Sequence, residues 1–266
     1  MTPVVEANGA RIPLLGLGTW DLRGRVCTRN VEQAIRLGYR HIDTAAIYDN
    51  EREVGDGVRA SGVPRDEIFI TTKVWSTRLS PPEFERSTRE SLVRLRLSEV
   101  DLLLIHWPNP SIPLSETIGS LCKMKREGLA RHIGISNFPV PLVEEAVRLS
   151  TEPLVCDQIE FHPYTDRSDI VAACRRHGLA VVAYSPIARG EVARDATLNE
   201  IGKRHGKSAT QVCLRWLVQQ GIIVIPRTAK VERLSSNADI FDFALNDEDM
   251  ATIQQLTRRE RRLVDF

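Results

Sequence analysis

The chain has 266 residues, of which 42% are hydrophobic and 27% are charged, an ordinary composition for a folded protein in water. No window approaches the roughly 18 uninterrupted apolar residues that a membrane-spanning helix needs. The 36 basic and 35 acidic residues leave a net charge of +1, which gives no general attraction for nucleic acid or an anionic membrane. These figures exclude disorder and membrane spanning, and they argue against a nucleic-acid partner.

The cysteines and the two termini bear on the compartment. The five cysteines are widely spread and form no C-x-x-C pair, so neither a disulfide framework nor a zinc site is predicted. The N-terminal MTPVVEANGARIPLLGLGTW lacks the basic and apolar regions of a secretion signal, and the C-terminal LVDF matches no retrieval or lipidation signal. We therefore expect a cytoplasmic protein.

Short apolar runs alternate with helical patterns along the chain. Residues 4–12 form two extended stretches around Asn8-Gly9, a dipeptide typical of the turn in a β-hairpin. The runs that follow are LLGLG, YRHIDTA, EIFITTKVW, VDLLLIHW, RHIGISN, LVCDQIEF, LAVVAYS and IIVIP. Residues 100–105 and 179–184 lack a period of two, as expected for parallel strands that are buried on both faces.

The spacing of these runs predicts the fold. Six of them begin 24 to 32 residues apart, the size of a βα unit, with helix signals such as Ser80-Pro81-Pro82-Glu83 between them. We expect an α/β protein in which residues 1–266 form one (β/α)₈ TIM barrel behind a short N-terminal hairpin. An open doubly wound sheet is the alternative, but Gly16-Leu17-Gly18-Thr19-Trp20-Asp21 lacks the third glycine of G-x-G-x-x-G.

Four ionisable residues fall at the predicted carboxyl ends of strands, where barrel enzymes carry their active sites. Asp43 ends the second run with Tyr48 five residues further on, Lys73 ends the third and His106 ends the fourth. Each also has a structural interpretation, as a helix cap, a rim aromatic, a solvated strand end or a core histidine. A lysine inside a β-branched strand is costly unless it is paired, which favours one shared site.

This set of residues suits the reduction of a carbonyl group. A tyrosine with a pKa of about 10 is a poor acid at neutral pH, and we expect the adjacent Lys73 to lower the pKa of Tyr48 by about one to three units. Asp43 would keep Lys73 charged, while a neutral His106 would donate a hydrogen bond to the substrate carbonyl. Tyr48 is then the predicted proton donor.

Six motifs together resemble the aldo-keto reductase superfamily over essentially the whole chain: GYRHIDTAAIYDNEREVG, ITTKVW, LLLIHWP, IGISNF, QIEFHPY and IPRTAKVERLSSN. By this resemblance the family's catalytic tetrad falls on Asp43, Tyr48, Lys73 and His106. The chain most resembles the short bacterial 2,5-diketo-D-gluconate and methylglyoxal reductases. The resemblance implies an NADPH-dependent oxidoreductase that reduces small α-dicarbonyls or keto-sugar acids to alcohols.

The resemblance also implies a binding site for NADPH. Ser136, Asn137 and Gln158 would bind the nicotinamide carboxamide, Tyr184 would stack on the ring, and the segment from Arg227 would hold the adenosine phosphate. Arg227 replaces the more usual lysine, and Ser236 stands where many members have glutamate. The implied cofactor contacts are Gly18, Thr19, Trp20, Asp43, Ser136, Asn137, Gln158, Tyr184, Ser185, Arg227, Thr228, Arg233 and Asn237. As alternatives, IGISNF is a strand with a helix cap, and KVERLSSN is a solvated helix.

The implied substrate site is formed by Trp20, Tyr48, Trp75, His106 and Trp107. The tryptophans have core packing as their alternative role, and we favour pocket walls. The loop after Trp107 is short, and the chain ends about ten residues after the last clear helical pattern. We therefore expect short substrate loops, an open pocket and weak affinity for small, polar carbonyls.

Two other functions remain open at this stage. Barrel lyases and isomerases use a strand-end lysine for a Schiff base, a role open to Lys73, with Arg227 as a phosphate ligand. A cofactor-binding redox sensor without turnover is the other alternative. The histidines show no H-E-x-x-H or other ligand spacing, so we expect no metal. The expected partner is a small carbonyl substrate, and the expected assembly is a monomer.

Overall fold

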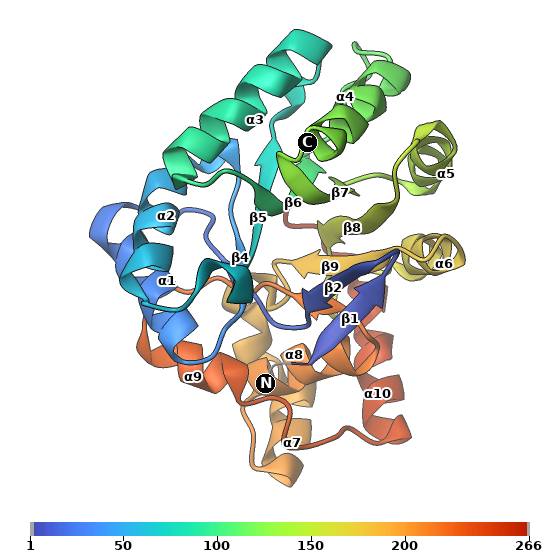
Figure 1. Cartoon of the computed structure of the whole chain (residues 1–266). Coiled ribbons are helices and arrows are strands. Elements are labelled where there is room, and N and C mark those ends of the chain that lie inside the picture. The colour runs from blue at the N-terminus through green and yellow to red at the C-terminus, as the bar shows by residue number, and fades with distance from the viewer. Residues whose placement is uncertain (1–2, 265–266) are drawn as a thin grey trace.

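In a computed structural model of the chain, which describes residues 3–264, parallel strands form a barrel with helices packed outside (Figure 1). The strands are β3 (Leu17–Gly18), β4 (His41–Asp43), β5 (Phe69–Val74), β6 (Val100–Ile105), β7 (Ala130–Ser136), β8 (Leu154–Glu160), β9 (Ala180–Tyr184) and β10 (Ile223–Val224). They pair in parallel and in chain order from β3 to β10. The eight strands and the (β/α)₈ class expected from the sequence are confirmed.

The barrel closes between its first and last strands. Leu15 forms a parallel bridge with Val224, and the amide of Gly16 donates to the Val224 carbonyl at 2.9 Å. A Cβ atom at Gly18 would lie 2.6 Å from the Ile225 carbonyl oxygen, so this close approach requires glycine. The closure overturns the alternative of an open doubly wound sheet.

Helices connect successive strands and cover the outside of the barrel. They are α1 (Gly24–Arg36), α2 (Glu51–Ala60), α3 (Pro81–Leu95), α4 (Leu114–Arg126), α5 (Val140–Leu149), α6 (Ser168–Arg176), α7 (Ala196–His205), α8 (Ala209–Gln219), α9 (Glu232–Ala238) and α10 (Asp247–Gln254). Helix α3 begins at Pro81, where the missing N–H has no intrahelical partner to lose. Among the described residues, no helix combines the length and the apolarity that crossing a membrane requires.

The N-terminal hairpin closes one end of the barrel. Strands β1 (Val4–Ala7) and β2 (Ala10–Pro13) are joined by Asn8 and Gly9, whose φ angles of +44° and +87° confirm the predicted turn. The Asn8 side chain donates to the carbonyls of Leu154 and His177 at 2.7 and 3.0 Å, beside the start of β8 and before β9. The hairpin therefore lies under the amino ends of the strands, and the carboxyl ends form the open mouth.

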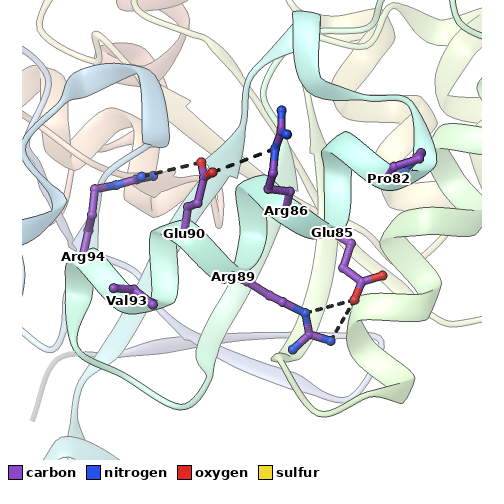
Figure 2. A pocket seen from close by; sticks show the side chains of 7 residues that line it. All are labelled: Pro82, Glu85, Arg86, Arg89, Glu90, Val93 and Arg94. Atoms are coloured by element: carbon purple, nitrogen blue, oxygen red, sulfur yellow. Dashed lines mark hydrogen bonds and ion pairs between the residues drawn. The ribbon is translucent and has the colours of Figure 1, made fainter.

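The outer face of α3 carries a shallow hollow lined by charged side chains (Figure 2). Glu90 pairs with Arg86 and Arg94, and Glu85 pairs with Arg89. These side chains are 31% to 57% exposed, so their interactions are those of a solvated helix surface. None of the residues that line this hollow lines the cavity at the mouth, and its charges are paired with one another and with neighbours such as Glu51, Lys123 and Glu127.

Candidate active site

The carboxyl ends of the strands surround a cavity of about 690 Å³. All five predicted substrate residues line it, and so do most of the predicted cofactor residues. The lining residues named from the sequence are Gly18, Trp20, Asp43, Tyr48, Trp75, His106, Trp107, Asn137, Gln158, Tyr184, Ser185, Arg227, Thr228 and Arg233. Four others, Lys73, Thr19, Ser136 and Asn237, are buried and do not line the cavity.

Lys73 is the centre of the predicted tetrad. Its ammonium donates to the Asp43 carboxylate at 2.6 Å and to the Thr44 carbonyl at 2.9 Å. It lies 3.4 Å from the Tyr48 hydroxyl, with both Lys73 and Asp43 almost wholly buried. The pairing predicted from the cost of burying a lone lysine is therefore present in the structure.

The two partners fix the protonation state of Lys73. Burial lowers its pKa, but Asp43 and Tyr48 raise it by more, so the net pKa lies above the ordinary value. Lys73 is consequently an ammonium group at neutral pH. A charged, fully hydrogen-bonded amine is a poor nucleophile, which argues against a Schiff-base role.

The sequence-based expectation for the pKa of Tyr48 is wrong in its sign. Burial raises this pKa by more than the charge of Lys73 lowers it, and Asp43 raises it further, so the net pKa lies above 10. The charge of Lys73 alone would lower the pKa, but the cost of removing the phenolate from water outweighs it. Tyr48 is therefore a protonated phenol at neutral pH.

His106 packs against Tyr48 on one side and Trp75 on the other. Its ring lies 5.6 Å from the Tyr48 ring and 5.1 Å from the Trp75 ring, with edge-to-face geometry in both cases. Burial, helped by the charge of Lys73, holds the pKa of His106 well below its usual range. The imidazole is therefore neutral. Its Nδ1 has no hydrogen-bond partner among residues 3–264, and a buried unpaired N–H is costly, so the hydrogen is favoured on Nε2.

Asn50, which the sequence reading missed, holds two of the mouth loops together. Its amide donates to the carbonyls of Thr19 and Leu22 at 2.7 and 3.0 Å, and its oxygen accepts from Thr44 at 2.8 Å. These bonds tie the loop after β3 to the loop that carries Tyr48. The signal available in the sequence was an asparagine directly before the helical pattern of α2, but its partners Thr19 and Leu22 lie too far along the chain to be predicted.

The amide groups predicted to bind nicotinamide form a connected network. Asn137 donates to the His106 carbonyl at 3.0 Å and accepts from the Tyr184 hydroxyl at 2.8 Å. Ser136 donates to the Gln158 carbonyl at 2.7 Å, and it supports the network from behind the cavity. The polar atoms of Asn137, Gln158 and Tyr184 thus meet at one end of the cavity.

The loop after β10 supplies basic groups at the other end. Arg227 donates to the carbonyls of Trp20 and Asp21 at 3.1 and 3.0 Å and approaches the Asp21 carboxylate at 3.3 Å. Arg233 and Lys230 also line the cavity and form no ion pair among the described residues. Asn237, predicted here as a cofactor contact, lies on the buried side of α9.

Several lining residues were not predicted from the sequence. They come from the loops after β3, β4, β9 and β10 and from the C-terminal segment, and they are Asp21, Arg23, Ile47, Pro186, Ile187, Arg189, Gly190, Ile225, Ala229, Lys230 and Val264. The guanidinium of Arg189 lies 5.2 Å from the Trp20 ring, in cation–π range across the cavity. Loop residues of this kind carry no periodic signal.

Within residues 3–264, no cluster of three or more His, Cys, Asp or Glu side chains suits a metal ion.

A closed parallel barrel with an Asp–Lys–Tyr group and a neutral histidine at its mouth has the architecture of an oxidoreductase that acts on carbonyl groups. The Aldo/keto reductase family model matches residues 14–258, and the chain belongs to this family. The family expected from the sequence motifs is thus confirmed.

Relatives cover nearly the whole chain. The chain is 42% identical over 253 residues to the methylglyoxal reductase DkgB of Escherichia coli O157:H7, which covers 94% of this chain and 95% of that protein. It is 41% identical to the glyoxal reductase of Bacillus subtilis, with 96% and 92% covered.

Solved structures agree with the fold. A crystal structure provisionally described as a 2,5-diketo-D-gluconic acid reductase B superposes with a TM-score of 0.98 at 48% identity, covering 100% of this chain and 95% of that one. An aldo-keto reductase of Bombyx mori in complex with NADP superposes with a TM-score of 0.92 at 35% identity, covering 100% of this chain and 95% of that one.

Proposed function

We propose that this protein reduces aldehydes and ketones to alcohols with NADPH, and that Tyr48 donates the proton. The observation that carries this proposal is the position of the Lys73 ammonium, 2.6 Å from Asp43 and 3.4 Å from the Tyr48 hydroxyl. Small α-dicarbonyls, such as methylglyoxal, or keto-sugar acids, such as 2,5-diketo-D-gluconate, are the proposed substrates. The names of the relatives from Escherichia coli and Bacillus subtilis support the first of these classes.

The residues around the cavity fit a phosphorylated nicotinamide dinucleotide. Amide groups of Asn137 and Gln158 stand at the end near the tetrad, and Arg233 and Lys230 stand beside Thr228 at the other. Arginine and lysine near a helix start suit a phosphate group. When bound, NADPH supplies the hydride, and the NADP complex of the Bombyx mori relative supports this cofactor.

The chain's own residues handle the proton and the developing charge. The Tyr48 hydroxyl gives its proton to the carbonyl oxygen, while Lys73 stabilises the phenolate that is left. His106, neutral and with hydrogen on Nε2, donates a hydrogen bond that polarises the carbonyl. Trp20, Trp75 and Trp107 wall the cavity and limit the access of water.

The experiment is a steady-state assay that follows NADPH consumption with methylglyoxal, phenylglyoxal, a keto-sugar acid and a bulky hydrophobic ketone. We expect turnover with the small activated carbonyls and a lower kcat/KM for the bulky ketone. NADPH binding without turnover of any carbonyl would favour the redox-sensor alternative. Borohydride trapping of a substrate on Lys73 without cofactor would favour the lyase alternative.

We further propose that residues 1–266 form one reductase domain that acts as a monomer in the cytoplasm, on the sequence grounds given above. Sedimentation equilibrium with and without NADPH tests the monomer. A dimer at micromolar concentration would contradict it.

A further inference from the structure

Glu160 is a buried carboxylate at the end of β8 that does not line the cavity, and its side chain is 2% exposed. Its Oε1 accepts the backbone amide of Leu263 at 2.7 Å, and its Oε2 accepts that of Val264 at 3.1 Å. The first of these partners lies 103 residues further along the chain. One side chain of the barrel wall thus holds two consecutive amides of the C-terminal segment.

His162 completes the environment of this carboxylate. The Nδ1 atom of His162 accepts the backbone amide of Tyr164 at 3.2 Å, so the ring hydrogen lies on Nε2 and is donated to Glu160 at 2.9 Å. Burial raises the pKa of Glu160, but hydrogen bonds from His162 and Leu263 lower it by more, and the carboxyl remains ionised. If the segment left, a buried charge would lose two of these three donors, which is strongly unfavourable.

The held segment reaches the cavity. Val264 is one of the cavity-lining residues. The Arg261 amide donates to the Tyr164 carbonyl at 2.8 Å, and the Arg261 guanidinium pairs with Glu191 at 2.7 Å. Glu191 belongs to the turn Ala188–Arg194, which also presents Arg189 to the cavity. Residues 261–264 therefore form one side of the rim.

We infer that Glu160 is a positioning residue that fixes residues 261–264 on the rim, so that Val264 serves as an apolar wall for the larger carbonyl substrates. This inference rests on the proposed reductase function for its kinetic part. Glu160 touches neither the tetrad nor the cavity, so it acts on binding through the segment and leaves the chemical step unchanged.

The first test removes one donor from the segment and leaves the barrel intact. Leu263→Pro has no backbone N–H to give to Glu160, whereas the matched control Leu263→Ala keeps it. We expect Leu263→Pro to raise KM for phenylglyoxal about fivefold or more relative to Leu263→Ala, because the apolar contact is lost. The kcat for phenylglyoxal and both constants for methylglyoxal, which is too small to span the cavity, should stay within about twofold.

The second test changes the acceptor. Glu160→Gln keeps the size of the side chain but turns one acceptor oxygen into an N–H donor that faces a backbone N–H. Glu200→Gln is the control, because Glu200 is 63% exposed on α7. We expect Glu160→Gln to raise KM for phenylglyoxal as Leu263→Pro does. In a variant truncated after Arg262, which lacks Leu263 and Val264, Glu160→Gln should have no further effect on KM. Additive effects would mean that Glu160 acts elsewhere, and they would overturn the inference.

A third measurement does not depend on catalysis. Trypsin cleavage after Arg261, followed by mass spectrometry, reports how firmly the segment is held, and the bond after Arg262 is left out because a proline at position 263 would block it. We expect cleavage at least about tenfold faster in Leu263→Pro and Glu160→Gln, and unchanged in the two controls, because the local opening free energy falls. If the two variants are cleaved faster but the unmodified protein reduces no carbonyl, Glu160 still holds the segment and only the proposed function is rejected. Unchanged cleavage with unchanged KM would overturn the inference itself.

Discussion

Gln158 donates a hydrogen bond of 2.8 Å to Oδ2 of Asp43, the carboxylate whose other oxygen holds Lys73 at 2.6 Å. This contact joins β8 to β4 across the mouth and satisfies both oxygens of a buried acid. The amide that the family resemblance assigns to the nicotinamide therefore also supports the ion pair beside Tyr48. Under the proposed function, one side chain would thus serve both the cofactor and the Asp43–Lys73 pair.

Tyr48→Phe removes the proposed proton donor and changes little else. We expect kcat with methylglyoxal to fall by about 10² or more, the usual contribution of general acid catalysis. The affinity for NADPH, measured by fluorescence titration, should stay within about threefold, because the basic residues at the far end of the cavity are untouched. Retention of a tenth of the activity would reject Tyr48 as the donor.

Lys73→Met separates the charge from the proton donor. Because the ammonium lowers the pKa of Tyr48, its removal should raise that pKa further. Alcohol oxidation with NADP needs the phenolate as a base, so its rise with pH should shift upward by about one unit or more. Carbonyl reduction should also slow by about tenfold or more, since the phenolate left by proton transfer loses its counter-charge. A pH profile that matches the unmodified protein would contradict this role for Lys73.

Arg233→Ala tests the basic end of the cavity. Charge-assisted hydrogen bonds contribute about 1.5 to 3 kcal/mol each, so the Kd for NADPH should rise about tenfold or more while that for NADH changes little. Arg148→Ala is a suitable control, because its guanidinium is 70% exposed on α5. Equal losses for both cofactors would show that Arg233 supports the helix start and does not bind the phosphate.

Asp157 predicts an unusual dependence of stability on pH. It precedes Gln158, whose side chain lines the cavity, so the Asp157 side chain points outward under the helices. Both carboxyl oxygens are buried and have no hydrogen-bond partner among residues 3–264. Burial raises the pKa of Asp157 to about 8, and the nearby Phe138 amide lowers it only in part.

The sign follows from proton linkage. Between about pH 4 and pH 8 the folded protein holds a proton on Asp157 that the unfolded chain has released, so the free energy of unfolding falls as the pH rises. Asp157→Asn has no titratable proton at this position and so removes this dependence of the free energy of unfolding on pH. We expect the stability advantage of Asp157→Asn, measured by urea denaturation, to grow by about 4 kcal/mol between pH 5 and pH 8. An advantage that does not vary with pH would mean that Asp157 is ionised in the folded protein.

The barrel and the tetrad were predictable from the sequence because both follow from local patterns. Uninterrupted apolar runs identified buried parallel strands, and the strand ends then placed Asp43, Lys73 and His106 at one mouth. Barrel closure needs no separate signal once eight βα units are counted. Motif resemblance supplied the family, which the comparison with the family model confirms.

The remaining features depend on contacts between residues far apart in the chain. The pKa of Tyr48 depends on how completely the fold removes water from the phenol, a quantity that a list of neighbouring charges does not contain. The roles of Asn50 and Glu160 come from backbone partners in other loops. Val264 was missed because the shortness of the C-terminal segment suggested an open rim, whereas Glu160 holds that short segment in place.

The hairpin under the barrel and the segment 261–264 at its mouth put the first and last described residues at opposite ends of the molecule. A strand of six residues spans about 20 Å, so an affinity tag joined to the N-terminus begins about one barrel length from the cavity. A tag joined to the C-terminus is attached only two residues along the chain from Val264. Kinetic constants from N-terminally and C-terminally tagged protein should therefore differ, and most strongly for substrates large enough to touch Val264.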